Sequence, residues 1–108
     1  MAWIYKITNT KTNKVYIGQT SQERGFKDRY CRKGRGIERV YNSYLYEQEH
    51  NRCYNVHLFR AIEKYGFDAF VVDEIFDVAL TECELNEKEM FYIKQFDSFY
   101  NGYNSTLG

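Results

Sequence analysis

The chain has 108 residues and a formal net charge of zero, which fits one globular domain with one modest hydrophobic core. The sequence contains no signal-peptide pattern and no apolar run of about 20 residues, so we expect neither secretion nor a membrane span. Its three cysteines lack the spacing of a structural zinc site, which indicates reduced thiols in a cytoplasmic protein.

Two short strands open the chain. Residues 3–8 and 14–19 are rich in β-branched and aromatic side chains and flank a polar turn. If the strands pair antiparallel, Tyr5 opposes Tyr16 on one face of the sheet. Tyrosine packs its ring but keeps a polar tip, so the pair fits either a small aromatic core or a wet contact surface.

A basic segment follows this hairpin. Between residues 23 and 39, seven lysines and arginines stand against three acidic residues. Such a segment in a neutral chain either binds a polyanion locally or is a solvated loop. We expect a short helix over residues 26–33, whereas residues 37–54 fit either a helix or a long functional loop.

The second half of the chain has clearer patterns. Asn55 is the predicted N-cap of a helix with apolar residues at i, i+3, i+4 and i+7, and Gly66 follows its end. Residues 67–76 are the predicted third strand. Thr81 and Glu84 form a capping box for a last helix.

Glu89 lies among apolar neighbours on one stripe of this last helix, which extends to about Phe96. A carboxylate directed toward a core is unfavourable unless it is paired or binds a cation. The pattern therefore leaves open a structural ion pair and a metal-binding role. Phosphodiester hydrolysis is one chemistry that combines a metal held by a carboxylate, a cation for the phosphate and a group that activates water.

Five short motifs occur in a characteristic order: the paired runs Trp3-Ile4-Tyr5 and Tyr16-Ile17-Gly18, FKDRY (26–30), LFRAIEKYGFDAF (58–70), NEKEMFYIKQFDS (86–98) and NGYN (101–104). Together they resemble the GIY-YIG nuclease family, in particular the catalytic domains of phage and intron-type homing endonucleases. The resemblance covers the whole chain. It implies one small nuclease domain over residues 1–108, of the α/β (α+β) class, with a three-stranded antiparallel sheet flanked by helices.

The resemblance also implies a metal-dependent DNA endonuclease. In this interpretation Tyr5 and Tyr16 assist water attack as base or relay, Arg29 stabilises the phosphate, and Glu89 holds one Mg²⁺ or Mn²⁺ ion. The residues expected to bind the substrate or support the site are Lys33, Asn104, His57, Arg32 and Arg35. We expect a monomer or weak homodimer, with a separate DNA-binding domain in a longer parent protein.

The sequence departs from the family pattern at three positions. Trp3 replaces the first glycine of the signature, and in the register above its ring would cover the bare backbone of Gly18. The stretch after Tyr16 is about two residues longer than in the homing enzymes, so Arg24 is a rival for the role of Arg29.

Lys33 stands where the family often has histidine or tyrosine, and lysine is a poorer base at neutral pH. This motivates an alternative function, a nucleic-acid-binding domain of the same fold with weak or no cleavage. A third hypothesis is a protein-interaction domain that uses the tyrosine-rich residues 41–54.

Overall fold

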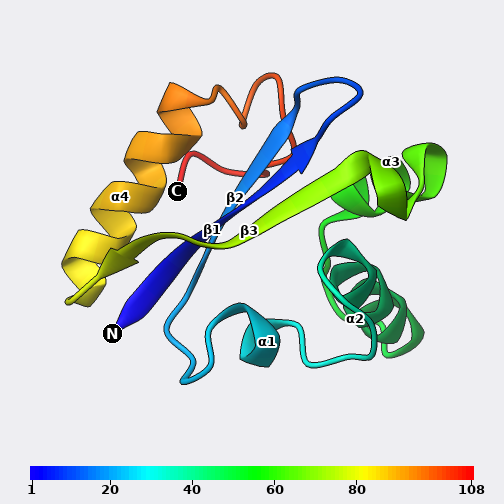
Figure 1. The fold of residues 1–108 in the computed structure, drawn as a ribbon, viewed down its shortest axis with the longest axis horizontal. Helices are drawn as coiled ribbons and strands as arrows, with labels where there is room; N and C mark the ends of the chain where they lie inside the picture. Colours follow the sequence, from blue (N-terminus) through cyan, green and yellow to red (C-terminus); the bar gives the residue numbers. More distant parts are fainter.

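The computed structural model describes all 108 residues and has a three-stranded antiparallel sheet in the order β2-β1-β3, flanked by helices. The elements in chain order are β1 (Ala2–Asn9), β2 (Val15–Thr20), α1 (Phe26–Arg29), α2 (Ile37–Glu49), α3 (Val56–Tyr65), a 3₁₀ turn (Phe67–Ala69), β3 (Phe70–Ala79) and α4 (Glu82–Gln95) (Figure 1). The predicted fold class is confirmed. No helix has the length and apolar character needed to cross a membrane.

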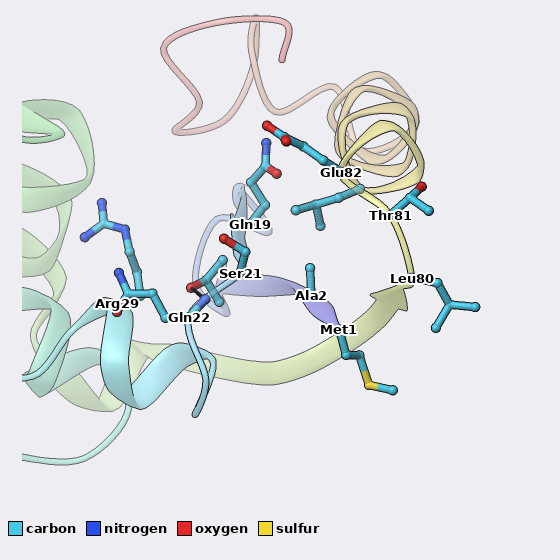
Figure 2. Close-up of a pocket in the computed structure, with 11 residues that line it drawn as sticks. Met1, Ala2, Gln19, Ser21, Gln22, Arg29, Leu80, Thr81 and Glu82 are labelled. Atoms are coloured by element: carbon cyan, nitrogen blue, oxygen red, sulfur yellow. Dashed lines mark hydrogen bonds between the residues drawn. The ribbon is translucent and has the colours of Figure 1, made fainter.

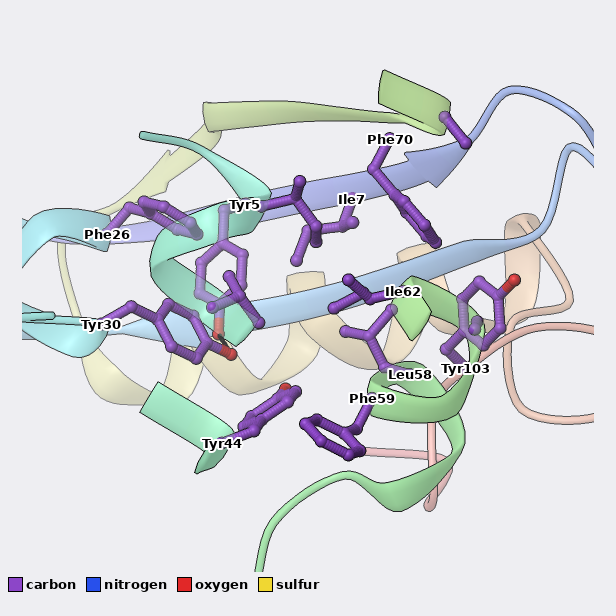
Figure 3. Packing of buried hydrophobic residues seen from close by; sticks show 14 residues of the cluster. Tyr5, Ile7, Phe26, Tyr30, Tyr44, Leu58, Phe59, Ile62, Phe70 and Tyr103 are labelled. Carbon is purple, nitrogen blue, oxygen red and sulfur yellow. Dashed lines mark hydrogen bonds between the residues drawn. The ribbon is translucent and has the colours of Figure 1, made fainter. Parts of the chain in front are cut away.

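The sheet separates two hydrophobic clusters. Since strand residues alternate between faces, Tyr5 and Ile7 of β1 pack with α1, α2 and α3 on one side. Ile4 of β1 packs with Leu85 and Ile93 of α4 on the other side. Figure 1 shows α4 apart from the other three helices, and Figure 3 shows the cluster that Tyr5 joins.

The predicted pairing of Tyr5 with Tyr16 is wrong. In the structure Tyr5 opposes Gly18, Ile7 opposes Tyr16, and Trp3 opposes Thr20. The register differs by two residues, so both tyrosines still project from the predicted face. Tyr5, and not Trp3, covers Gly18, because a Cβ atom added at Gly18 would overlap the Tyr5 ring.

The turn explains this register. Asn13 adopts a positive φ of 61° and donates its backbone N–H to the carbonyl of Asn9 at 2.7 Å, so the chain reverses one residue later than we expected. The side chain of Asn9 also accepts from the backbone of Lys11 at 3.0 Å. The ring of Trp3 lies instead against Gly25, just before α1.

The helices after the hairpin differ from the prediction in length. α1 is one turn, from Phe26 to Arg29, and not the predicted helix over 26–33. The ambiguous stretch forms α2, which buries Ile37, Val40 and Tyr44 at helical spacing. Its signal was weak because most of its other residues are polar or charged.

The later elements follow their local signals. The side chain of Asn55 accepts from the backbone of Leu58 at 2.9 Å, and Gly66 ends α3 with a φ of 82°. Thr81 caps α4 by accepting from the backbone of Glu84 at 3.1 Å. β3 begins after the 3₁₀ turn and runs to Ala79, three residues beyond the predicted end.

Candidate active site

A cleft of about 310 Å³ lies beside β2, one of the two edge strands of the sheet. Four of the predicted site residues line it: Tyr16, Arg29, Glu89 and Asn104. They come from β2, α1, α4 and the C-terminal segment, which are far apart in the sequence. The fold therefore brings together in one cleft a phenol, a guanidinium, a carboxylate and an amide.

Glu89 is half-buried and has no lysine, arginine or histidine within 4.0 Å, so the structural ion pair that the sequence left open is absent. Its one side-chain partner is Gln19, whose amide donates to Oε1 at 3.0 Å. Burial raises the pKa of the Glu89 carboxyl above its ordinary value, and the Gln19 hydrogen bond opposes this rise. Glu89 is thus a desolvated acid without a compensating cation.

Arg29, and not Arg24, lines the cleft. The guanidinium of Arg29 lies 4.5 Å from the centroid of the Tyr30 ring and has no acidic partner. Arg24 instead pairs with Asp28 at 2.7 Å and lines a different depression, next to Trp3. Of the two arginines that the sequence offered, only Arg29 therefore lies in the cleft.

The two signature tyrosines have different environments. Tyr5 is 1% exposed, and its hydroxyl lies 2.9 Å from that of Tyr30. Tyr16 is half-buried and lines the cleft, with its ring centroid 6.2 Å from that of Tyr5. Burial raises the pKa of both phenols above the ordinary value, so both are neutral at neutral pH.

Sequence reasoning missed the roles of Tyr30 and Tyr44. Both are buried, with ring centroids 6.1 Å apart, and they form the wall behind Tyr5 (Figure 3). Tyr44 also lines the cleft. The sequence did offer a signal for Tyr30, which is the aromatic residue directly after Arg29. It offered none for Tyr44, which lies in the stretch without a clear pattern.

Asn104 holds the C-terminal segment on the edge of the sheet. Its amide accepts from the backbone N–H of Ile17 at 2.9 Å and donates to the carbonyl of Ile17 at 2.8 Å. Asn55 adds a link from α3 by donating to the carbonyl of Tyr103 at 2.7 Å. Asn104 therefore shapes a wall of the cleft, and its amide is already engaged with β2.

The other residues expected to bind substrate lie outside the cleft. The ring of His57 packs edge-on against Tyr103 at 5.1 Å, beside a separate depression. Arg35 lines another depression near Phe67, and Lys33 is exposed. Arg32 lies over the ring of a tyrosine in α2. Their contact with substrate stays a prediction.

A second hollow of about 530 Å³ lies on the other side of Arg29. Figure 2 shows Arg29 and Gln22 on one side of it and Glu82, at the start of α4, on the other. Gln19 lines this hollow and also donates to Glu89 of the cleft. Arg29 therefore borders both hollows, and Gln19 connects the second hollow to Glu89 through a hydrogen bond.

The residues of the cleft fit one type of metal site. No group of three or more His, Cys, Asp or Glu side chains is arranged to hold an ion, which excludes a closed protein cage. A single carboxylate suits Mg²⁺, because this ion usually keeps several waters and completes its shell with substrate phosphate. Glu89 is the one predicted ligand, and its oxygen chemistry matches Mg²⁺ or Mn²⁺.

Comparisons with known proteins support the resemblance found in the sequence. No family model matches the chain. It is 32% identical over 103 residues to Intron-associated endonuclease 1 of Enterobacteria phage T4. The matched region covers 94% of this chain and 35% of that protein. The chain thus spans about a third of the length of this relative.

Two solved structures share the fold. The catalytic domain of homing endonuclease I-TevI matches 98% of this chain and 99% of its own, with a TM-score of 0.65 and 25% identity. A mutant of the same intron endonuclease domain matches 99% of this chain and 95% of its own, with a TM-score of 0.70 and 27% identity.

Proposed function

We propose that the chain is a DNA endonuclease domain of the GIY-YIG type that hydrolyses phosphodiester bonds with a divalent metal. It is similar in sequence to the phage T4 endonuclease and in fold to the catalytic domain of homing endonuclease I-TevI. One observation carries the proposal beyond the homology. In the cleft beside β2, a carboxylate without a cationic partner lies with a guanidinium without an acidic partner. A metal ion would complement the carboxylate, and a phosphate would complement the guanidinium.

Glu89 is the residue that would hold the ion, either Mg²⁺ or Mn²⁺. Half-burial of its carboxylate without a cation is unfavourable, and a divalent ion removes this penalty. When bound, such an ion lowers the pKa of a coordinated water and stabilises negative charge on the phosphate. Gln19 fixes the orientation of the carboxylate through its hydrogen bond to Oε1.

Arg29 would bind the phosphate that is cleaved. Its planar guanidinium can donate two parallel hydrogen bonds to phosphate oxygens. Contact with the Tyr30 ring restricts the position of this plane without occupying the N–H groups at its edge. As water attacks, negative charge accumulates on the phosphate oxygens, and Arg29, which lines the cleft, would stabilise it.

Tyr16 is the better candidate for contact with the attacking water. Water and phosphate have no access to the hydroxyl of Tyr5, which is buried against Tyr30. Tyr16 lines the cleft, and because its raised pKa keeps the phenol neutral, it would act as a hydrogen-bonding relay that orients the water. Tyr5 would support the position of the site from behind.

A plasmid-nicking assay with Mg²⁺ or Mn²⁺ tests this proposal. We expect Glu89→Gln and Arg29→Gln each to reduce the rate by about 10²–10³-fold, the size of effect seen when one stabilising group is removed. Arg24→Gln is the matched control, because Arg24 pairs with Asp28 outside the cleft, and it should retain the rate. Full-rate cleavage by the Glu89 and Arg29 variants would contradict the mechanism.

The nicking assay together with a DNA-binding measurement separates the proposal from its alternative. If the native chain binds duplex DNA saturably but cleaves no substrate with either metal, the alternative holds, and the domain binds nucleic acid without cleaving it. The 35% coverage of the phage T4 relative supports a longer parent protein. We propose that a separate domain of this parent selects the DNA target.

A further inference from the structure

Arg32, Tyr46 and Arg52 form a cluster, and the residues directly after Tyr46 and Arg52 in the chain line the cleft. We propose that this arginine–tyrosine cluster is a second DNA-binding site, which holds backbone phosphates of the duplex on the α2 side of the cleaved bond. The inference rests on the proposed function in taking DNA as the substrate. It adds Tyr46 and Arg52, which no sequence motif singled out.

One aromatic ring organises the cluster. The guanidinium carbon of Arg32 lies 3.6 Å from the centroid of the Tyr46 ring, and that of Arg52 lies 5.6 Å from it. The ring of His50 also stacks on Tyr46 at 3.9 Å, and its Nδ1 lies 2.8 Å from the carbonyl of Tyr46. Three segments thus converge on one side chain: the loop after α1, α2 itself and the loop after α2.

The charges of the cluster are uncompensated. Neither Arg32 nor Arg52 has a carboxylate within 4.0 Å, and neither guanidinium makes a hydrogen bond within the protein. Two like charges on one ring repel each other, and the cation–π contact with the ring offsets only part of this. Arg24 shows the contrasting case, since its guanidinium is satisfied by Asp28.

The same arrangement occurs inside the cleft. Arg29 also lies against a tyrosine ring and has no acidic partner. Contact with a ring face leaves the N–H groups at the edge of a guanidinium free, and these groups match the geometry of phosphate oxygens. Arg32 and Arg52 are therefore held ready for phosphate, as Arg29 is.

The position of the cluster matches a DNA backbone that leaves the cleft over α2. Tyr46 directly precedes Glu47, and Arg52 directly precedes Cys53; both Glu47 and Cys53 line the cleft. Arg32 lies three residues after Arg29. A strand with its cleaved phosphate at Arg29 would therefore meet the cluster at the rim of the same cleft.

Salt-dependent binding tests this proposal. Fluorescence anisotropy would measure the affinity of the full chain for a labelled duplex in EDTA, where no metal-dependent cleavage occurs, over a range of KCl concentrations. Each phosphate neutralised contributes about 0.9 to the slope of log affinity against log salt concentration. We expect the double variant Arg32→Gln/Arg52→Gln to have a slope smaller by about 1.8 and an affinity about tenfold lower at low salt.

Two further variants sharpen the test. Arg60→Gln/Lys64→Gln makes the same change in charge on α3, beside a separate depression, and should leave the slope unchanged. Tyr46→Phe keeps an aromatic ring and should bind like the native chain, whereas Tyr46→Ala should weaken binding while both charges remain. Thermal unfolding of each variant verifies that it is folded.

The outcomes distinguish the two proposals. If the native chain binds and cleaves DNA but the Arg32/Arg52 variant keeps its affinity and salt slope, the cluster proposal is overturned and the endonuclease proposal stands. An equal loss of affinity in the Arg60→Gln/Lys64→Gln variant would also overturn it, because the affinity would then depend on net charge and not on the position of the arginines. If the native chain binds no duplex at low salt, the proposed function itself fails.

Discussion

Removing one hydroxyl group from each signature tyrosine separates packing from chemistry. In Tyr5→Phe the ring still covers Gly18, but the hydroxyl of Tyr30 loses its partner at 2.9 Å. Loss of a buried hydrogen bond costs about 1–2 kcal/mol of unfolding free energy. For a domain of this size, each kcal/mol lowers the melting temperature by about 4–8 °C.

Tyr16→Phe should reduce the cleavage rate and leave the stability of the fold almost unchanged. Tyr16 is half-buried beside the cleft, where water can replace the contacts of its hydroxyl, so the unfolding free energy should change by less than about 0.5 kcal/mol. If this hydroxyl orients the attacking water, its removal should reduce the cleavage rate by about 10²–10⁴-fold. Tyr5→Phe should remain within a few-fold of the native rate at a temperature where it is fully folded.

Both variants would be measured for thermal unfolding by circular dichroism and for plasmid nicking with Mg²⁺. The reasoning is refuted if Tyr5→Phe abolishes cleavage without changing the melting temperature while Tyr16→Phe cleaves at the native rate. That result would mean that the buried phenol, and not the one at the cleft, handles the water.

Three further outcomes are expected. Gly18→Ala should lower the unfolding free energy measured in urea by about 1–3 kcal/mol, because its methyl group would overlap the buried ring of Tyr5. Asn104→Ala should lower it by a similar amount, about 1–3 kcal/mol, since both amide contacts with the backbone of Ile17 are lost. Burial raises the pKa of Glu89, so the folded chain holds this proton more tightly than the unfolded chain, and the charged carboxylate opposes folding. Glu89→Gln should therefore be more stable than the native chain at pH 7.5 in metal-free urea titrations, and this advantage should disappear as the pH falls below about 4.3, the ordinary glutamate pKa.

The elements that the sequence predicted well are those with local signals. Asn55 and Gly66 delimit α3 by capping interactions within a few residues, and Thr81 does the same for the start of α4. The inward position of Glu89 followed from the periodicity of a single helix. Each of these features depends on residues close in sequence, which is why one sequence was sufficient.

The register of the hairpin could not be predicted in this way. It depends on the fit of the Tyr5 ring over Gly18 and on a turn in which Asn13 takes a positive φ. A shift by two residues keeps every side chain on its face, so the hydrophobic pattern alone does not distinguish the two registers. The register is set by the volumes of the side chains that face each other across the strands, and the hydrophobic pattern does not describe these volumes.

The difference between the two tyrosines has its origin in the order of the strands. The hairpin alone makes Tyr5 and Tyr16 equivalent, since each lies on one of two paired strands. β3, which begins more than sixty residues after β1 ends, pairs with β1 and not with β2. β1 thereby becomes the central strand and its tyrosine is enclosed, whereas β2 remains an edge strand and Tyr16 borders the cleft. A long-range pairing thus determines which of the two phenols borders the cleft.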